Sequence, residues 1–485
     1  MLSKSSLIIQ NTPVIGKGEI FCRYSPKDEQ LLYELNQASI SQVSYAIKTA
    51  KEAQKDWQKI GVKSREELLM KYAIKIKENA DFISQLISQE TGKPLWESKQ
   101  EVKSMINKVS ISCKAYKTRC KQVNQKNNNI KIHTRYKALG LIAVLGPYNF
   151  PGHIPLGHII PALISGNTVV FKPSQYCMKT GFELIKLWVD CNSPPSIINV
   201  LQGDERIGHS LVTHPDIDAV FFTGSEKNGR DIARFHAMNY EKILALELGG
   251  NNPIILHDTK QAKHAINIII ESAFISAGQR CSCARRLIIC KNKDNQILFK
   301  ELVKKVKSIK ISKEEGFMGS LISMQAVNQA LKQQSLLQNK GGKVFLEMKK
   351  KFKKGAYLSP GIMDVTNISQ RPDEEIFAPL LQVIWVDSIE EAIYEANNTI
   401  YGLSASVITE KKSVFDEIFC KVDAGIINWN RPTTGACSSA PFGGVKASGN
   451  HRPAAYFMID SCVTPIVSST TKTCESTLNH HFFKQ

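Results

Sequence analysis

The sequence lacks any long hydrophobic run. Across 485 residues, no apolar stretch approaches the roughly 18 residues that a helix needs to cross a bilayer. Near the N-terminus the only apolar run is Leu7–Ile9, which is far shorter than the roughly 7–15 residues of a secretory signal. We therefore expect a soluble, cytoplasmic protein with no membrane partner.

The sequence also lacks paired cysteine motifs. Its 12 cysteines are scattered, no CxxC occurs, and the single CxC, Cys281 and Cys283, has no second half elsewhere. Structural zinc sites and small disulfide scaffolds depend on such pairs. The pattern predicts reduced thiols in a reducing compartment and no metal site.

Acidic residues are too few to balance the basic ones, and the formal net charge is +19. The densest basic run, Lys349–Lys354, contains one aromatic residue, Phe352, which falls short of a stacking platform for nucleic acid. We interpret the run as a solvent-exposed loop and expect no nucleic-acid partner. A field that gathers an anionic substrate is compatible with the charge.

The overall composition is that of an ordinary globular protein, in a chain long enough for two or three domains. Ser39 and Gln42 match a capping box, and apolar residues from Ile40 to Trp57 follow at helical spacing. Leu68–Ile83 repeats that pattern. The first quarter therefore predicts amphipathic helices that cover a sheet.

From Leu139 onward, short apolar runs alternate with helical segments. The first set is Leu141–Leu145, Thr168–Phe171, Ile198–Leu201 and Ala219–Phe222. The second set includes Pro253–Leu256, Leu287–Cys290 and Gln382–Val386. Runs without alternation suit strands that are buried on both faces. The pattern predicts an α/β fold with βαβ units, a parallel doubly wound sheet and a second α/β domain.

Two polar segments differ from this alternation of apolar runs and helical segments. Gln122–Tyr136 interrupts the first domain and is expected to form a loop or a protruding hairpin. The Ser/Thr-rich segment after about Val467 is expected to be a loose tail.

Four short motifs carry candidate chemistry, and each has an ordinary explanation. Cys281 follows Gly278-Gln-Arg, and an isolated cysteine is more often a small buried apolar residue than a nucleophile. Glu247, in Leu246-Glu-Leu-Gly-Gly, is acidic among apolar neighbours, where a raised pKa would let it act as a base. A glutamate elsewhere is usually a solvated surface group.

Asn149 lies in Gly146-Pro-Tyr-Asn-Phe-Pro, directly after a predicted buried strand. Asparagine in such a turn is usually only a turn residue, although its amide can also stabilise an oxyanion. Phe222-Thr-Gly-Ser-Glu-Lys-Asn-Gly229 follows a strand and begins a helix, so its N–H groups can face a pyrophosphate. It is not a Walker A motif, because Arg230 follows Gly229.

Taken together, the motifs resemble those of the aldehyde dehydrogenase superfamily along nearly the whole chain. The matching motifs, in order, are Pro147-Tyr-Asn-Phe-Pro, Phe171-Lys-Pro-Ser, Phe222-Thr-Gly-Ser, Leu246-Glu-Leu-Gly-Gly, Gly278-Gln-Arg-Cys, Glu375-Ile-Phe-Ala-Pro and Pro441-Phe-Gly-Gly. The resemblance implies that Cys281 is the nucleophile and that the Asn149 amide stabilises the oxyanion. Glu247 would activate the water that releases a free acid.

The resemblance also implies a set of cofactor-binding residues. These are Lys172 and Gln175 at the adenosine ribose, Gly224, Ser225, Glu226, Lys227, Asn228 and Gly229 at the pyrophosphate, and Glu375 and Phe377 at the nicotinamide end. Many relatives carry glutamate at the position of Gln175, where it repels a 2′-phosphate. The neutral amide here makes NAD the expected cofactor without excluding NADP.

Several stretches resemble one branch of the superfamily, the N-succinylglutamate 5-semialdehyde dehydrogenases of arginine catabolism. They include Pro151-Gly-His-Ile-Pro-Leu-Gly-His and Cys281-Ser-Cys-Ala-Arg-Arg. Such a substrate requires cationic or N–H partners for its carboxylates. Arg285, Arg286 and Arg452 are candidates, with structural ion pairing an equal alternative. For His153 and His158, packing or capping is favoured over substrate contact, and Cys283 is expected to be structural.

Alternatives remain at this stage. Another semialdehyde, succinic or glutamic, can be the substrate, and a non-catalytic binding protein is the remaining, disfavoured reading. The resemblance implies a Rossmann-like cofactor domain at 1–122 and 138–249 and a catalytic domain at 250–445. Segments 123–137 and 455–475 would form a small β oligomerisation arm, followed by a polar tail at 476–485. A homodimer or homotetramer is expected.

Overall fold

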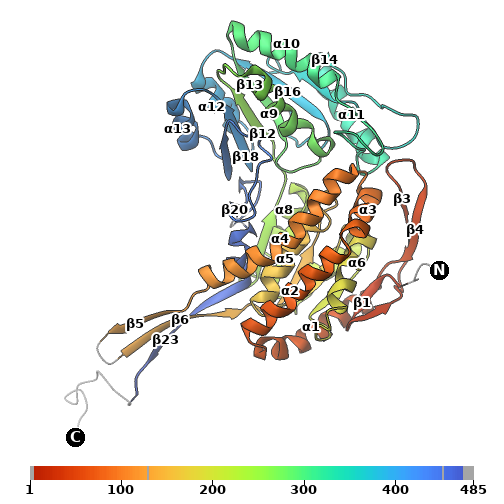
Figure 1. Ribbon diagram of the computed structural model, residues 1–485, viewed down its shortest axis with the longest axis vertical. Coiled ribbons are helices and arrows are strands. Elements are labelled where there is room, and N and C mark those ends of the chain that lie inside the picture. The colour runs from red at the N-terminus through yellow and green to blue at the C-terminus, as the bar shows by residue number, and fades with distance from the viewer. Residues whose placement is uncertain (1–4, 128–129, 451–452, 473–485) are drawn as a thin grey trace.

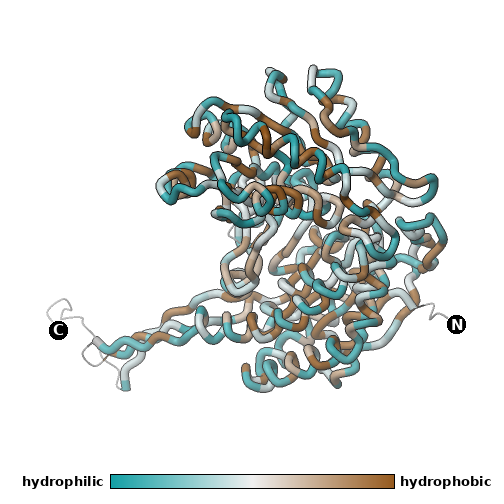
Figure 2. The backbone as a smooth tube through the Cα atoms, turned by 45° about the horizontal axis from the view of Figure 1, so that its top comes forward, coloured by the Kyte–Doolittle hydropathy of each residue, from teal (hydrophilic) through white to brown (hydrophobic). Residues whose placement is uncertain are grey.

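The computed structural model describes residues 5–127, 130–450 and 453–472. They form two lobes and a projecting arm, and each lobe surrounds a seven-stranded sheet (Figure 1). This arrangement confirms the predicted α/β class with two α/β units. In Figure 2 the helices over the sheets alternate between hydrophilic and hydrophobic residues, as amphipathic helices do.

The first sheet has the strand order β11-β10-β7-β8-β9-β1-β2. Its strands are β1 (Leu7–Ile9), β2 (Thr12–Val14), β7 (Leu141–Leu145), β8 (Thr168–Lys172), β9 (Ile198–Val200), β10 (Ala219–Thr223) and β11 (Ile243–Glu247). Strands β7 to β11 run parallel, whereas β1 and β2 are antiparallel additions at one edge. The four apolar runs predicted as strands here are confirmed.

In the described ranges, eight helices surround the first sheet. They are α1 (Ile40–Lys59), α2 (Val62–Glu78), α3 (Ala80–Thr91), α4 (Leu95–Arg119), α5 (His153–Ile164), α6 (Met178–Val189), α7 (Glu205–Val212) and α8 (Glu226–Phe235). The predicted capping box is confirmed, because Ser39 accepts from Gln42 N while Gln42 accepts from Ser39 N. The continuous helix predicted over Leu68–Ile83 is wrong. The chain leaves helical geometry at Asn79, whose side-chain amide bonds back to Lys75 O at 2.9 Å.

The second sheet has the order β14-β15-β16-β13-β12-β18-β19 and is parallel except for β14. Its strands are β12 (Asn252–Leu256), β13 (Ala284–Cys290), β14 (Lys343–Leu346), β15 (Gly361–Asp364), β16 (Leu380–Val386), β18 (Ser404–Ile408) and β19 (Ile426–Trp429). Its helices are α9 (Ala262–Phe274), α10 (Lys293–Lys307), α11 (Met324–Asn339), α12 (Ile389–Asn397) and α13 (Lys412–Lys421).

Short elements complete the fold. They are the pairs β3 (Ile20–Tyr24) with β4 (Leu31–Asn36), β17 (Tyr401–Gly402) with β21 (Val445–Lys446) and β20 (Pro441–Phe442) with β22 (Ala454–Ala455), and the 3₁₀ segments η1 (Ile275–Gly278) and η2 (Tyr456–Cys462). The basic run Lys349–Lys354 lies in a loop with its lysines exposed, as predicted.

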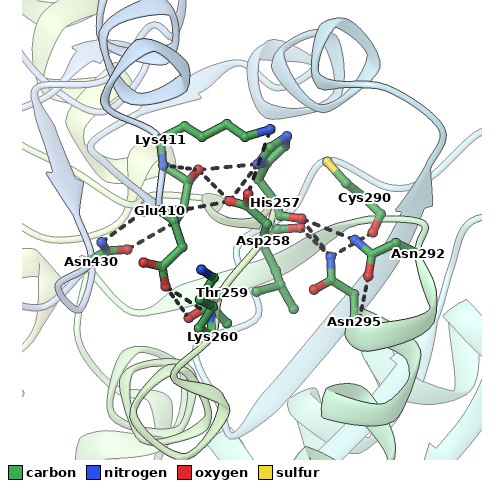
Figure 3. Close-up of polar contacts among 12 residues, drawn as sticks. His257, Asp258, Thr259, Lys260, Cys290, Asn292, Asn295, Glu410, Lys411 and Asn430 are labelled. Atoms are coloured by element: carbon green, nitrogen blue, oxygen red, sulfur yellow. Dashed lines mark hydrogen bonds and ion pairs between the residues drawn. The ribbon is translucent and has the colours of Figure 1, made fainter.

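A polar network closes the carboxyl edge of the second sheet (Figure 3). Asp258, just after β12, accepts from Thr409 Oγ1 at 2.7 Å and from Glu410 N at 3.1 Å, just after β18. Asn295 of α10 donates to His257 O at 2.9 Å and to Cys290 O at 2.8 Å. These bonds tie three strand ends to one another and to a helix.

The arm is a three-stranded antiparallel sheet of β5 (Val123–Asn127), β6 (Ile130–Ala138) and β23 (Val463–Thr470), and it extends away from the body (Figure 1). The tract around Gln122–Tyr136 is thus a hairpin. The loose tail expected from about Val467 is wrong as far as Thr470, because this segment pairs in register with β6. Residues 476–485, the predicted polar tail, lie outside the described part of the chain.

The arm also begins later than 455 in the sequence. Residues 456–462 form η2, and Met458, Ile459 and Cys462 are buried in the core of the first lobe. Within the described ranges, no helix is long and apolar enough to cross a membrane.

Candidate active site

The predicted site residues lie on facing edges of the two sheets. The first sheet contributes its carboxyl edge, where β7 leads to Asn149 and where Lys172, Thr223 and Glu247 end their strands. The second sheet contributes its amino edge, because Cys281 lies just before β13. The site is therefore assembled across the boundary between the lobes.

One pocket of about 240 Å³ contains both Cys281 and Glu247. Its wall also includes Lys108 of α4, Phe150 and His153 after β7, and residues of the loop that precedes β20. Among the described residues that line the pocket, Glu247 is the only one with a carboxylate. The pocket therefore places the Cys281 thiol and the Glu247 carboxylate around a space that can admit a small substrate, with a second thiol, Cys437, on the loop before β20.

The backbone before Cys281 has an unusual shape. Ser276 and Ala277 both adopt left-handed conformations, with φ of 55° and 53°, and Gly278 follows at φ 76°. Left-handed backbone is costly for residues with a side chain, and two in succession persist only when neighbouring groups hold them. A Cβ at Gly278 would lie 2.3 Å from Ala378 O, so this position also requires glycine for space.

Glu97 of α4 holds the left-handed segment from one side. Its carboxylate accepts from Ser276 Oγ and pairs with Arg280 at 2.9 Å, while Arg280 Nε also donates to Ser276 Oγ at 2.7 Å. The side chain of Glu97 is 1% exposed. A buried, charge-assisted network thus fixes the loop directly before the nucleophile candidate.

Arg285 holds the same loop from the other side. It donates to Gly278 O at 2.6 Å and to Arg280 O at 2.9 Å, and it pairs with Glu375 at 3.2 Å. Its side chain is completely buried. Of the two roles considered for Arg285, the structural ion pair is the one that the structure shows, because every bond recorded for its guanidinium goes to the loop or to Glu375.

Arg286, the next arginine candidate, does not line the pocket either. Arg286 is buried and donates to backbone oxygens of Asn251, Glu395 and Ala396, so the structural role is again the one that the structure shows. Arg452 lies outside the described residues. The expectation that Cys283 is structural agrees with its complete burial and its contact with Ile275 O.

Asn149 is joined to the thiol loop through a hydrogen bond. Its side-chain amide is buried and donates to Gln279 O at 3.0 Å, two residues before Cys281. An amide nitrogen carries two hydrogens, so a second remains for a ligand. On the other side of the loop, Asn252 Nδ2 donates to Cys281 O at 2.6 Å and Cys283 O at 2.8 Å.

Glu247 is 3% exposed at the end of β11, and its Oε1 has no hydrogen-bond partner among the described residues. Burial raises the pKa of this carboxyl to about 8. Gly449 pairs with it from the C-terminal segment, where a Cβ would lie 2.4 Å from Leu246 O. An uncompensated carboxyl at a pocket wall is the arrangement expected of a general base.

The thiol of Cys281 is in an environment that favours its neutral form. Burial raises its pKa, and the nearby carboxylates of Glu247 and Glu375 raise it further, while Arg285 acts in the opposite direction. A thiol of this kind needs a base or an added positive charge before it can act as a nucleophile.

A second pocket, of about 360 Å³, brings together Lys172, Gln175 and Asn228. Lys172 is 8% exposed, and burial lowers its pKa to about 8, against the opposing effect of Asp204. Its only recorded bond is to Pro173 O at 3.4 Å. A buried ammonium with so weak a partner suits an incoming polar ligand such as a ribose hydroxyl.

The remaining predicted cofactor residues lie around these pockets. Ser225 caps α8 by accepting from Asn228 N, so Gly224 to Gly229 form a helix N-terminus beside the Lys172 pocket. Glu375 lies against Gly249, where a Cβ would be 2.2 Å from its Oε2, and Phe377 contacts Tyr148 edge-on at 6.1 Å. Arg285, which holds the Cys281 loop, pairs with Glu375 and lies over the Phe377 ring at 5.2 Å, so both residues lie beside that loop.

His153 and His158 both line the Cys281 pocket. His158 is fully buried and packs edge-on against Phe221, which fits the favoured packing role. Burial, reinforced by Lys108, lowers the pKa of His158 to about 4, and burial likewise lowers that of His153. Both rings are therefore neutral at physiological pH.

Sequence reasoning missed the part that α4 plays. Glu97 holds the thiol loop, Glu101 accepts from Gly152 N and His153 N at 3.0 and 3.1 Å, and Lys108 enters the pocket. These positions share one helix face with the buried Val102, Met105 and Val109. Charged residues within the apolar stripe of a helix were the signal that could have revealed them.

The chain matches the family model described as "Aldehyde dehydrogenase family" over residues 15–464. It is also similar to the aldehyde dehydrogenase KauB from Pseudomonas aeruginosa, with 27% identity, a TM-score of 0.91 and coverage of 96% of each chain. A second similar structure is the NADP-dependent glyceraldehyde-3-phosphate dehydrogenase from Bacillus halodurans C-125 complexed with NADP, with 27% identity, a TM-score of 0.91 and coverage of 97% of this chain and 99% of that chain.

A third is an indole-3-acetaldehyde dehydrogenase in complex with NAD⁺, with 26% identity, a TM-score of 0.91 and coverage of 96% of each chain. Family match and structural similarity both extend across almost the entire sequence. The protein described here belongs to the aldehyde dehydrogenase family.

Proposed function

We propose that this protein oxidises N-succinyl-L-glutamate 5-semialdehyde to N-succinyl-L-glutamate with NAD(P) as oxidant. The observation that carries the reaction type is the shared pocket of Cys281 and Glu247, with Asn149 bonded to the same loop. The substrate assignment rests on the resemblance of the sequence around these residues to one branch of the family. Another semialdehyde is the second candidate.

Cys281 is proposed to attack the aldehyde carbon. A bond forms between Sγ and that carbon, the carbonyl electrons move to oxygen, and the thiol proton passes to the Glu247 carboxylate or to water. The second N–H of Asn149 and the backbone N–H of Cys281 are proposed to stabilise the oxyanion. Removal of two electrons and the aldehyde hydrogen then leaves a thioester on Cys281.

Glu247 is proposed to take a proton from the water that attacks the thioester. The carbon–oxygen bond forms, the carbon–sulfur bond breaks, and the acid leaves while the thiol is regenerated. A carboxyl with a pKa of about 8 is a stronger base than an ordinary glutamate, which supports this role.

Lys172, Gln175 and the N-terminus of α8 are proposed to hold the dinucleotide, with Glu375 and Phe377 near its nicotinamide end. When bound, NAD(P) accepts the hydride that the substrate loses. The pocket fits this ligand, because a buried ammonium, a helix N-terminus and an amide line it. Gln175 carries no charge to repel a 2′-phosphate, so NAD is the proposed cofactor and NADP an accepted substitute.

The proposed assembly is a homodimer or homotetramer, as is typical of the family. The arm supports this, because β5 and β23 are edge strands on a sheet that extends from the body (Figure 1). Sedimentation of the intact protein and of a variant truncated after residue 462 tests the arm's part in assembly.

The decisive assay measures NADH formation with N-succinylglutamate, succinic and glutamic semialdehydes. The expected result is the highest kcat/KM with the succinylated substrate and production of one free acid per NADH. Equal efficiency with all three, or a clear preference for another aldehyde, contradicts the substrate assignment. Absence of turnover with every aldehyde contradicts the reaction itself.

A further inference from the structure

The pocket that contains Cys281 also contains a buried lysine that the proposed reaction does not use. Lys108 of α4 is 3% exposed and forms part of the pocket wall. The Nζ and Cε atoms of Lys108 lie 3.8 Å from the position of a Cβ on Gly157, so the ammonium rests beside α5. The lysine reaches the pocket from a helix of the first lobe.

Lys108 differs from the other cations around this pocket in its partners. Lys93 pairs with Glu101 at 2.9 Å, Arg280 with Glu97 at 2.9 Å and Arg285 with Glu375 at 3.2 Å. The only bond recorded for Lys108 goes to the hydroxyl of Ser438 at 3.1 Å. Among the described residues it has no carboxylate within ion-pair distance.

An ammonium removed from water without an anion is costly, and the neutral hydroxyl of Ser438 offsets little of that cost. Consistent with this, burial lowers the pKa of Lys108 to about 8, against the opposing effect of the nearby Cys437 thiol. The arrival of an anion would restore a charge-assisted hydrogen bond of the kind that the neighbouring cations already have. The lysine is therefore prepared for an anionic ligand.

Further polar atoms in the same wall also lack partners. Thr434 Oγ1 and His153 Nδ1 are buried without a hydrogen bond among the described residues, and both residues line the pocket. Together with Ser438, Thr434 belongs to the loop before β20. Hydroxyl donors and one ammonium around a small cavity are a set that recognises a carboxylate.

We propose that Lys108 and Ser438 bind a carboxylate of the substrate while Cys281 reacts with the aldehyde at its other end. This inference rests on the proposed function and specifies its substrate class as aldehydes that bear a carboxylate. A neutral aldehyde of the same size would leave Lys108 without an anion. Lys108 is thus a specificity-determining residue, in a role for which the sequence analysis named only arginines as candidates.

The test compares Lys108→Met with a matched control, Lys103→Met, which removes a solvent-exposed lysine from the same helix. Substrates are succinic semialdehyde, N-succinylglutamate semialdehyde and neutral butanal. For Lys108→Met we expect KM for the anionic aldehydes to rise about 10–100-fold, the range for loss of a hydrogen bond to a charged group. Its kcat/KM for butanal should change less than threefold, and Lys103→Met should match the wild type throughout.

A second measurement does not depend on turnover. Glutarate should raise the melting temperature of the wild type and of Lys103→Met, but not that of Lys108→Met, and Ser438→Ala should show a smaller shift than the wild type. If Lys108→Met fails to fold, Lys108→Gln replaces it in both assays.

The inference is overturned if Lys108→Met loses kcat/KM equally with anionic and neutral aldehydes. It is also overturned if glutarate raises the melting temperature of the wild type and of Lys108→Met equally. If the wild type oxidises no aldehyde but glutarate protection depends on Lys108, the anion site stands and the proposed function fails. If the wild type oxidises all three substrates and Lys108→Met oxidises them equally well, the function stands and the anion site fails.

Discussion

The two sheets contribute to the site through opposite edges. The first sheet contributes its carboxyl edge, where Glu247 ends β11 and Lys172 ends β8, as is general for ligand sites in parallel sheets. The second sheet contributes its amino edge, where Cys281 and Glu375 precede β13 and β16. Its carboxyl edge, with equally dense polar groups, is occupied by bonds around Asp258 (Figure 3).

The edges differ in whether their polar groups have hydrogen-bond partners rather than in the types of residue that they carry. Asp258 has three partners at its carboxylate, whereas Glu247 Oε1 has none among the described residues. Buried polar groups without partners are costly and mark places where a ligand completes the bonding. The carboxyl edge of the first sheet and the amino edge of the second sheet therefore face each other across the site. The carboxyl edge of the second sheet, whose polar groups are bonded, stabilises the fold.

The largest effect is expected at the amino edge of the second sheet. Cys281→Ala should reduce NADH formation by a factor of at least about 10³, because it removes the thiol that is proposed to form the thioester, while the second thiol of the pocket, Cys437, lies on the loop before β20. Steady-state kinetics with the best semialdehyde measures it. The matched control, Cys283→Ala, removes a thiol that only packs, so it should retain activity within about tenfold. A Cys281→Ala variant that still produces NADH at a tenth of the wild-type rate would refute the role.

The next effect is expected at the carboxyl edge of the first sheet. Glu247→Gln should lower steady-state turnover by a factor of about 10²–10⁴ through slow thioester hydrolysis. A first burst of NADH, equal to the amount of enzyme, should remain. Rapid-mixing absorbance measures the burst, and intact mass spectrometry detects the acylated Cys281. Loss of the burst together with the steady state would place Glu247 in the first half-reaction instead.

The pH dependence sharpens the same prediction. Burial raises the pKa of Glu247 to about 8, so its basic form is the minority at pH 6 and predominates above pH 8. The hydrolysis rate should rise with pH until about 8 and then level, and Glu247→Gln should remove that rise. The contribution of Glu247 to folding stability changes with pH in the opposite direction to the hydrolysis rate. Keeping Glu247 protonated favours the folded state below pH 4.5, and this contribution is lost as pH rises through 8.

A smaller effect is expected in the cofactor pocket. Gln175→Glu would place a carboxylate beside Lys172, where it repels a 2′-phosphate but accepts bonds from ribose hydroxyls. We expect kcat/KM for NADP to fall about tenfold and that for NAD to change less than threefold, in line with about 1–2 kcal/mol for one charge contact. Initial rates with each cofactor measure the ratio. An unchanged ratio would place Gln175 away from the ribose.

The smallest effect on catalysis is expected at the carboxyl edge of the second sheet, where the polar groups are bonded to one another. Asp258→Ala removes the acceptor for Thr409 and Glu410 and should lower the free energy of unfolding by about 1–2 kcal/mol. Turnover at 25 °C should stay within twofold of the wild type. Urea unfolding and steady-state kinetics measure the two quantities. A large loss of activity in a stable Asp258→Ala protein would remove the distinction between the edges.

The sequence predicted the strands well because buried parallel strands are continuous apolar runs, as in Leu141–Leu145. It predicted which residues the fold brings to one pocket, Cys281 with Glu247 and Lys172 with Gln175, because the motifs resembled a family. It did not predict the break at Asn79, because asparagine fits both a helix and its end. The segment from about Val467 was expected to be a loose tail because Ser/Thr-rich residues that pair only in an arm lack an apolar signal.

Arg285 and Lys108 show a further limit of sequence reasoning. Both residues are cations. Arg285 lies in the same sequence motif as Cys281, whereas Lys108 lies 173 residues before Cys281 in an ordinary helix. Only the fold reveals that Glu375 pairs with the arginine and that the lysine has no carboxylate partner within the described part of the chain. Proximity in sequence made Arg285 a candidate and left Lys108 unnamed, since pairing is decided by tertiary contacts.

The left-handed turn at Ser276 and Ala277 has a consequence for the evolution and engineering of this protein. Because Glu97 and Arg280 impose its shape from outside, the turn is encoded jointly by two distant stretches of the gene. Chimeras that take residues 95–119 from one relative and 275–285 from another should have a misaligned thiol, unless both parents carry the residues equivalent to Glu97, Ser276 and Arg280. Swapping the two stretches together preserves the reactive geometry.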